Sequence, residues 1–144
     1  MPNAQSILER KGSDVATVDR KSSVLDAAKL MNQKRIGAVV VRDGDKIVGI
    51  FTERDVLNRI VAAGRDPKAT PIGEVMTSPM ACCRRDAKLS DCKAIMTQKR
   101  IRHLPVVEDG TLFGLISTGD ILASEVDDNQ ATIEYLHEYL YGRR

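Results

Sequence analysis

Aromatic residues are scarce in this sequence: it has no tryptophan, and phenylalanine and tyrosine supply only 3% of its 144 residues. The core must therefore be built from aliphatic side chains, and a hydrophobic fraction of 42% is sufficient for a globular protein. An excess of one charge is missing too, because the formal net charge is only +2 and acidic and basic residues are interspersed. This balance argues against a nucleic-acid-binding arm and against a membrane-surface patch.

Long hydrophobic runs are also absent. The first 14 residues lack the apolar segment of a secretory signal, and no stretch approaches the ~20 apolar residues of a membrane span. The three cysteines, Cys82, Cys83 and Cys92, are odd in number and lack CxxC spacing, and the two histidines are far apart in the sequence. We therefore expect buried or half-buried thiols in a cytoplasmic environment, with neither a disulfide framework nor a metal site.

What the sequence does contain is an internal repeat. The heptad GIFTERD at 49–55 recurs as GLISTGD at 114–120, and residues 24–57 align without a gap on residues 89–122. One such unit is too small to bury much apolar surface alone, so we expect the two copies to pack about a pseudo-two-fold axis with two equivalent clefts between them. The predicted divisions are repeat 1 at 7–64, a proline-containing linker at 65–71, repeat 2 at 72–125 and a tail at 126–144.

Each unit has the same predicted order of elements, β-α-β-β-α, which makes the fold class α+β. A short strand (16–18, and 81–83 in the second copy) leads into a helix that Ser23 caps, with apolar residues at helical spacing. Two β-branched runs then flank the hairpin turn Asp43-Gly44, and a second helix ends near Gly64. The C-terminal tail has the amphipathic pattern of a further helix.

The repeated heptad fits two roles. Thr52 and Ser117 stand at predicted strand-to-helix junctions, where a hydroxyl caps the helix and an aspartate three residues on, Asp55 or Asp120, completes a capping box. The same geometry suits a ligand, because a helix N-terminus attracts phosphate and a carboxylate can accept hydrogen bonds from both hydroxyls of a ribose. The two roles are compatible.

These features together resemble a tandem pair of CBS (cystathionine β-synthase) domains, a Bateman module, over residues 7 to 125. The resemblance rests on the two heptads, on IRHLPVVEDG at 101–110 and on IGEVMTSP at 72–79. It implies a non-enzymatic sensor that requires no cofactor and binds an adenosine nucleotide (AMP, ADP, ATP or NADH) as its regulatory ligand. It also implies a homodimer and a regulated protein target, with neither nucleic acid nor a membrane as partner.

The resemblance further implies which residues bind the ligand, with Ser or Thr on phosphate, Asp on ribose and the adjoining strands around the base. Arg102 and His103 have Gly37 and Ala38 as counterparts in the other copy, so the two clefts are expected to differ. For the apolar members a place in the core is the alternative, and for Arg102 an ordinary solvated side chain. The full set is Thr17, Val18, Gly37, Ala38, Val39, Thr52, Arg54, Asp55, Cys82, Arg102, His103, Leu104, Pro105, Ser117, Thr118 and Asp120.

Other interpretations stay open at this point. A ligand-free dimerisation or docking module needs the same fold, and the apolar pairs Val56-Leu57 and Ile60-Val61 on a second helix favour self-association. A small hydrolase is disfavoured because the sequence has no Walker motif and no triad-like spacing. Gly49 and Gly114 permit either the close approach of another backbone or a β-bulge.

Overall fold

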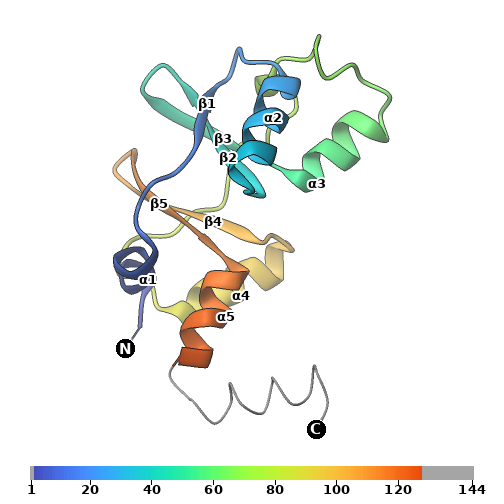
Figure 1. Ribbon diagram of the computed structural model, residues 1–144. Coiled ribbons are helices and arrows are strands. Elements are labelled where there is room, and N and C mark those ends of the chain that lie inside the picture. The colour runs from blue at the N-terminus through green and yellow to red at the C-terminus, as the bar shows by residue number, and fades with distance from the viewer. Residues whose placement is uncertain (1, 128–144) are drawn as a thin grey trace, which may run out of the picture.

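The structure, a computed structural model, describes residues 2–127 and consists of two similar halves that lie one above the other in Figure 1. Both halves mix helices with a small sheet, which confirms the predicted α+β class. The predicted tail helix, from residue 132 onward, lies outside the described residues. The elements are α1 (Ala4–Lys11), β1 (Thr17–Asp19), α2 (Val24–Lys34), β2 (Ala38–Asp43), β3 (Lys46–Thr52), α3 (Glu53–Asp55), the π-helix η1 (Val56–Val61), the 3-10 helix η2 (Ile72–Glu74), α4 (Leu89–Lys99), β4 (His103–Glu108), β5 (Thr111–Ser117) and α5 (Thr118–Asp127).

The first half is a three-stranded sheet covered on one face by α2. β1 pairs in parallel with β2, and β2 pairs antiparallel with β3 across the predicted hairpin turn. Ser23 caps α2 as predicted, because its side chain accepts a hydrogen bond of 3.1 Å from the N–H of Asp26. One turn apart along α2, Val24, Ala27 and Met31 are buried against the sheet and form the first hydrophobic core.

Strand β2 is buried on both faces. Val39 and Val41 join the core under α2, whereas Ala38 and Val40 lie outside that core and are nevertheless buried. Alternate strand residues point to opposite faces of a sheet, so Ala38 and Val40 belong to the face that the other half of the molecule covers. Continuous apolar runs predict this arrangement, in which each small sheet has its twin as a partner.

The second half departs from the predicted pattern at its first strand. The expected strand at 81–83 is reduced to a single bridge between Cys83 and Val106. In the first half, the N–H of Val40 donates to the carbonyl of Ala16, but the matching position in the second half is Pro105, which has no N–H. At the other end, the carboxylate of Glu108 accepts a hydrogen bond of 2.8 Å from the N–H of Arg85. In the first half, the N–H at the matching position donates instead to a backbone carbonyl of β2, which extends the parallel pairing of β1 with β2.

The second helix of the first half is wound more loosely than the pattern predicts. It starts as a single α-turn, α3, and continues as the π-helix η1, where the N–H of Ala62 donates to the carbonyl of Leu57. It ends near Gly64, as predicted, where a φ of 69° is favoured by glycine. The matching helix of the second half, α5, is a regular α-helix.

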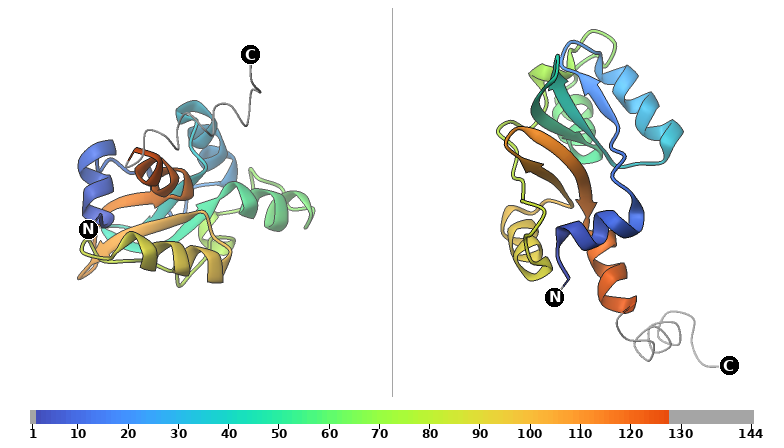
Figure 2. Two further views of the ribbon diagram at one scale, coloured as in Figure 1. Left: turned by 90° about the horizontal axis from the view of Figure 1, so that it is seen from below. Right: turned by 90° about the vertical axis from the view of Figure 1, so that its left-hand side faces the viewer.

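The two halves exchange the segments that precede their sheets. Ile7 and Leu8 of α1 are buried in the core of the second half, together with Cys92 and Met96 of α4. Figure 2 shows α1 beside α5 and β5, at the opposite end of the molecule from α2. The N–H of Ala4 donates to the carbonyl of Ala87, which ties α1 to the second half through the backbone.

The complementary segment crosses in the other direction. Ile72 and Val75 of the second repeat are buried in the core of the first half. The N–H of Ile72 donates to the carbonyl of Ser22, and the N–H of Gly73 donates to the carbonyl of Arg20. Each hydrophobic core is therefore completed by a segment from the other sequence repeat.

The paired glycines of the heptads make room for these crossing segments. A Cβ at Gly49 would lie 2.7 Å from the carbonyl oxygen of Thr77, and a Cβ at Gly114 would collide with the side chain of Leu8. Both strands also carry a bulge next to the glycine, because the register between the paired strands shifts at Val41 and at Val106. The sequence left two explanations open for these glycines, the close approach of another segment and a β-bulge. The structure shows both.

Because Ile7 fills the second core, its truncation should destabilise a half of the protein that lies far from it in sequence. We expect Ile7→Ala to lower the free energy of unfolding by about 2–4 kcal/mol, the usual loss for a buried aliphatic side chain. Urea denaturation of the variant and of an exposed control on the same helix, Glu9→Ala, measures this. Equal and small losses for the two variants would contradict the exchange.

Candidate functional site

The two heptads adopt the same geometry at matched junctions. Where β3 meets α3, the N–H of Thr52 donates to Oδ2 of Asp55 (3.0 Å), and the N–H of Asp55 donates back to Oγ1 of Thr52 (3.4 Å). Where β5 meets α5, Ser117 and Asp120 repeat both bonds at 2.8 and 3.1 Å. The capping role is therefore realised twice. We call Thr52 with Asp55 the first heptad site, and Ser117 with Asp120 the second heptad site.

In the first heptad site, the carboxylate is nearly buried and is held by an arginine of its own helix. The Nε of Arg59 lies 3.5 Å from Oδ1 of Asp55. The Nη1 of the same guanidinium donates to the carbonyls of Val75 (2.9 Å) and Met76 (2.8 Å). Arg59 thus connects the first carboxylate to the segment that enters the second repeat.

In the second heptad site, the cation comes from the N-terminal helix instead. The Nζ of Lys11 donates to Oδ2 of Asp120 (2.7 Å) and to the carbonyl of Leu115 (2.9 Å). Burial alone would raise the pKa of Asp120, but the hydrogen bonds from Lys11 and from the N–H of Ser117 outweigh it and lower that pKa. The second carboxylate is therefore ionised at neutral pH and forms an ion pair with the ammonium group of Lys11.

The two halves meet beside these carboxylates. A Cβ at Gly37 would lie 3.1 Å from Oε1 of Glu53 and 3.2 Å from Cε1 of His103, so a first-half glycine and a second-half histidine are close neighbours. Matched backbone bonds fix each heptad to the start of the adjoining strand: the N–H of Glu53 donates to the carbonyl of Gly37, and the N–H of Thr118 to that of Arg102. The structure thus brings Gly37, Arg102, His103 and Thr118 to the junctions.

Charged groups of both halves face His103. Burial is the first reason that the pKa of His103 lies below its ordinary value of 6.5, and the charges of Lys11 and Arg102 lower it further. Glu53 and Asp120 act in the opposite direction. The imidazole is consequently neutral at physiological pH, and it offers a ligand one donor and one acceptor.

Several of the sequence-predicted residues do not present their side chains to these sites. The side chains of Val18 and Val39 lie in the first hydrophobic core, and that of Leu104 lies in the second. Ala38 and Pro105 are buried outside the two cores.

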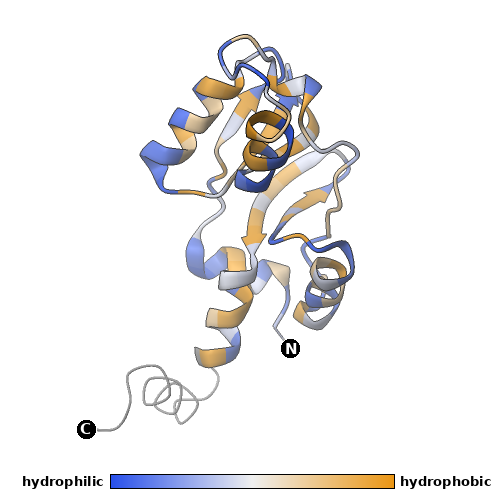
Figure 3. Cartoon of the chain, turned by 90° about the vertical axis from the view of Figure 1, so that its right-hand side faces the viewer, coloured by the Kyte–Doolittle hydropathy of each residue, from blue (hydrophilic) through white to orange (hydrophobic). Residues whose placement is uncertain are grey.

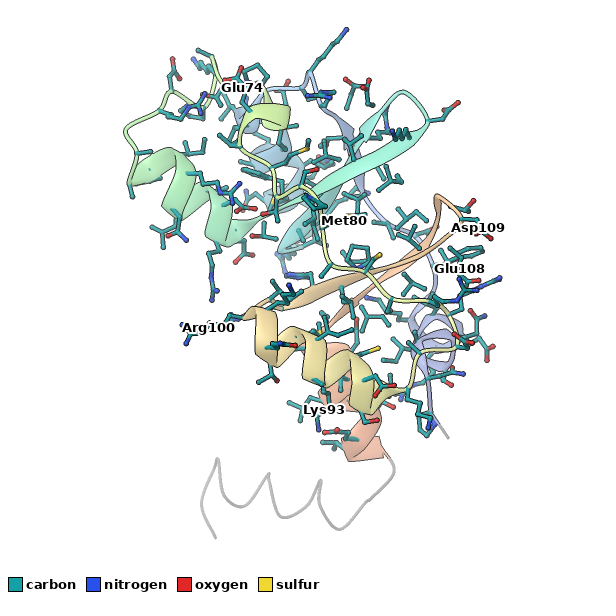
Figure 4. All side chains as sticks on the ribbon, turned by 180° about the vertical axis from the view of Figure 1, so that it is seen from behind. Glu74, Met80, Lys93, Arg100, Glu108 and Asp109 are labelled. Atoms are coloured by element: carbon teal, nitrogen blue, oxygen red, sulfur yellow. The ribbon has the colours of Figure 1, made fainter. Side chains whose placement is uncertain are left out.

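The remaining predicted residues are polar or exposed. The Oγ1 of Thr17 accepts a hydrogen bond of 3.4 Å from Arg42, and Cys82 is exposed. Arg54 donates across the halves to the carbonyl of Arg100 (3.0 Å), and Figure 4 shows Arg100 at the end of α4 nearest the first half. Arg54 therefore joins the two halves.

Three functional candidates were not predicted from the sequence: Lys11, Glu53 and Arg59. Glu53 and Arg59 lie on the helix that the first heptad starts, but nothing in a local pattern shows that they reach the other half. Lys11 lies inside the predicted repeat 1 but before the gap-free alignment of residues 24–57 on 89–122. Upstream of that alignment, Ile7 matches Ile72 and Glu9 matches Glu74 at the same spacing of 65, which indicates that the segment before the first strand belongs to the repeat.

Each half of the molecule has a groove between its two helices, next to the helix that its heptad starts. One groove of about 430 Å³ lies between α2 and the helix α3–η1, and is lined by Met31, Ile36 and Val56 among others. The other, of about 390 Å³, lies between α4 and α5, where Lys93 and Glu125 form an ion pair of 2.6 Å. Figure 4 shows Lys93 on the side of α4 that faces α5.

The comparisons with known proteins agree with this architecture. The model of the CBS domain matches the chain twice, at residues 9–62 and 72–127. The chain belongs to the CBS domain family. Within the described residues, no helix is long and apolar enough to cross a membrane, and no cluster of three or more potential metal ligands occurs.

Relatives share the whole tandem arrangement. The chain is 36% identical to the mitochondrial CBS domain-containing protein CBSX3 of Arabidopsis thaliana, over 83% of this chain and 61% of that protein. It is 32% identical to the CBS domain-containing protein YhcV of Bacillus subtilis, over 88% and 89% of the two chains. A solved structure of a protein with CBS domains from Burkholderia ambifaria superposes with a TM-score of 0.86 at 42% identity, covering 89% and 96%. A tandem CBS pair of this kind suggests a regulatory or sensor module.

The environment of His103 predicts a pH dependence of stability. Its pKa is lowered in the folded state, so the unfolded chain binds the proton more tightly, and stability is lost as the pH falls through about 6.5. His103→Gln should remove that part of the loss between about pH 7.5 and about pH 5.5. Thermal unfolding over this range tests it, with His137→Gln, outside the described residues, as the comparison. An unchanged pH dependence in His103→Gln would contradict the burial of a neutral imidazole.

Proposed function

We propose that this chain is a cytoplasmic, non-enzymatic regulatory module whose two heptad sites bind adenosine nucleotides: AMP, ADP, ATP or a dinucleotide such as NADH. The observation that carries the proposal is the matched pair of carboxylates, Asp55 and Asp120, each fixed by a capping box at the edge of the contact between the halves. A ligand held at such an edge touches both halves and can bias their arrangement. Regulation then follows from any difference in its affinity for the available arrangements.

The chemistry of the heptad suits a nucleoside. A fixed carboxylate can accept hydrogen bonds from two neighbouring ribose hydroxyls, and these charge-assisted bonds are stronger than neutral ones. Capping is compatible with ribose binding. The N–H groups of Thr52 and Ser117 both donate to Oδ2 of their aspartate, so these capping bonds do not use Oδ1. Gly37 and Arg102 stand next to the heptads where the adjoining strands begin, so the base would lie beside them. The three unpaired cysteines are consistent with a reducing compartment.

The ribose role predicts a loss of binding when the carboxylates are removed. Asp55→Ala and Asp120→Ala should each weaken AMP binding at their own site by about 1.5–3 kcal/mol, and the double variant should lose both sites. Asp55→Asn and Asp120→Asn keep a capping oxygen and therefore separate ligand binding from stability. Titration calorimetry measures the affinities, with exposed Asp45→Ala as the control. A double variant that binds AMP like the parent chain would refute the proposal.

A second function, assembly, is favoured by a separate observation. Leu57 and Val61 on the first half and Leu122 on the second are exposed by 60%, 66% and 58%, and Leu57 and Leu122 occupy matched positions of the repeat. Figure 3 shows that much of α5 is hydrophobic. Exposed apolar side chains at matched positions suit a symmetric contact between two copies, and closed two-fold symmetry is the commonest arrangement.

We therefore expect a homodimer that depends on these leucines. Leu57→Glu combined with Leu122→Glu should convert it to a monomer, because charges would enter an apolar contact. Light scattering at tens of micromolar concentration checks this, with Lys46→Glu on the β2–β3 hairpin as the control. A parent chain that is monomeric, or a double variant that remains dimeric, would rule out this interface.

A further inference from the structure

Lys11 is the cation of the second heptad site, and the residue at its matching repeat position in the first half is uncharged. It is the last residue of α1, the helix that crosses from the first repeat to pack on the second half. Its ammonium group bridges Asp120 and the carbonyl of Leu115, and its side chain is 38% exposed. The residue 65 positions further on, at the matching place in the first half, is Met76, whose Sδ would lie 2.8 Å from a Cβ at Gly49.

The cations of the two heptad sites differ in how the protein holds them. In the first site, the Nη1 of Arg59 is committed to the carbonyls of Val75 and Met76, which hold the arginine against the crossing segment. In the second site, the ammonium of Lys11 has three donors, and its two contacts within the described residues use two of them. Its flexible stem also lets the charge move by several ångströms while α1 stays in place.

A nucleoside and a nucleotide would therefore meet different conditions at Asp120. Adenosine must share that carboxylate with Lys11, and it offers the ammonium group no anionic acceptor in return. The phosphate of a phosphorylated nucleoside can accept a hydrogen bond from the remaining N–H of Lys11. It can also replace Asp120 as the partner of the ammonium group. His103, the first residue of β4, lies within electrostatic reach of Lys11, Asp120 and Arg102, so it offers a donor near them.

We propose that Lys11 makes the second heptad site select phosphorylated adenosine over adenosine itself. This inference rests on the proposed function, since it assumes that the ribose binds Asp120. The first heptad site, where Met76 takes the matching position, lacks this selection. Lys11 is thus a specificity-determining residue, supplied to the second repeat by a helix at the start of the first.

The test compares AMP with adenosine by titration calorimetry in an Asp55→Ala background, so that binding at the second heptad site is measured. Lys11→Met should weaken AMP binding about tenfold, the scale of one charge-assisted hydrogen bond. It should leave adenosine binding unchanged or tighter, because Asp120 no longer has a competing partner. Lys46→Met makes the same change of charge on the distant β2–β3 hairpin and should alter neither affinity, and Lys11→Arg should keep most of the preference for AMP.

The outcomes separate this inference from the proposed function. If Lys11→Met changes AMP and adenosine binding by the same factor, or changes neither, Lys11 does not select the phosphate and the inference is wrong. If the Asp55→Ala protein and the parent chain bind neither compound, the proposed function itself fails. Circular dichroism of every variant confirms that the second half, which α1 completes, remains folded.

Discussion

The exchange of short segments between the two halves is the constraint on which the rest of this structure depends. Each sheet is too small to form a core alone, and each core is completed by apolar residues from the other repeat: Ile7 and Leu8 in one direction, Ile72 and Val75 in the other. The exchange explains why glycine stands at 49 and 114, since a side chain there would collide with the crossing segments. It also makes the two halves one folding unit, because neither core is complete without the other repeat.

The same exchange gives the two heptad sites their different chemistry. Both sites begin with an identical arrangement, a capping box in which a strand ends and a helix starts. The crossing segment then adds Lys11 to the second site, whereas in the first it adds backbone carbonyls that engage Arg59. In the proposed function, folding and ligand binding therefore use the same residues. A capped helix start needs a fixed carboxylate for stability, and that fixed carboxylate is what a ribose needs as an acceptor.

Much of the fold could be predicted because local chemistry determines it. The cap at Ser23, the hairpins and the helix stop at Gly64 each depend on one or two residues with a strong conformational preference. Asp109 and Gly110, for example, have φ values of 50° and 78°, as a tight hairpin turn requires. The repeat then supplied the overall arrangement, because two copies of one small unit have few ways to cover each other's apolar surface.

What could not be predicted depends on contacts between distant parts of the chain. The loss of the strand at 81–83 follows from Pro105, but only once the pairing register is known. Lys11 and Asp120 are 109 positions apart, and no local pattern indicates that α1 packs on the second half. The apolar candidates Val18, Val39 and Leu104 fit a strand beside a ligand and a strand in a core equally well, and their side chains lie in the cores.

The central claim is that the repeated aspartates receive the ribose of an adenosine nucleotide. A crystal structure of the full chain grown with AMP tests it most directly, because it shows the position of every ligand atom. The account predicts AMP at the contact between the halves, with its ribose hydroxyls within about 3 Å of the carboxylate of Asp55 or Asp120. AMP bound in the grooves between the helices, or a crystal saturated with AMP that shows none at either heptad, would contradict it.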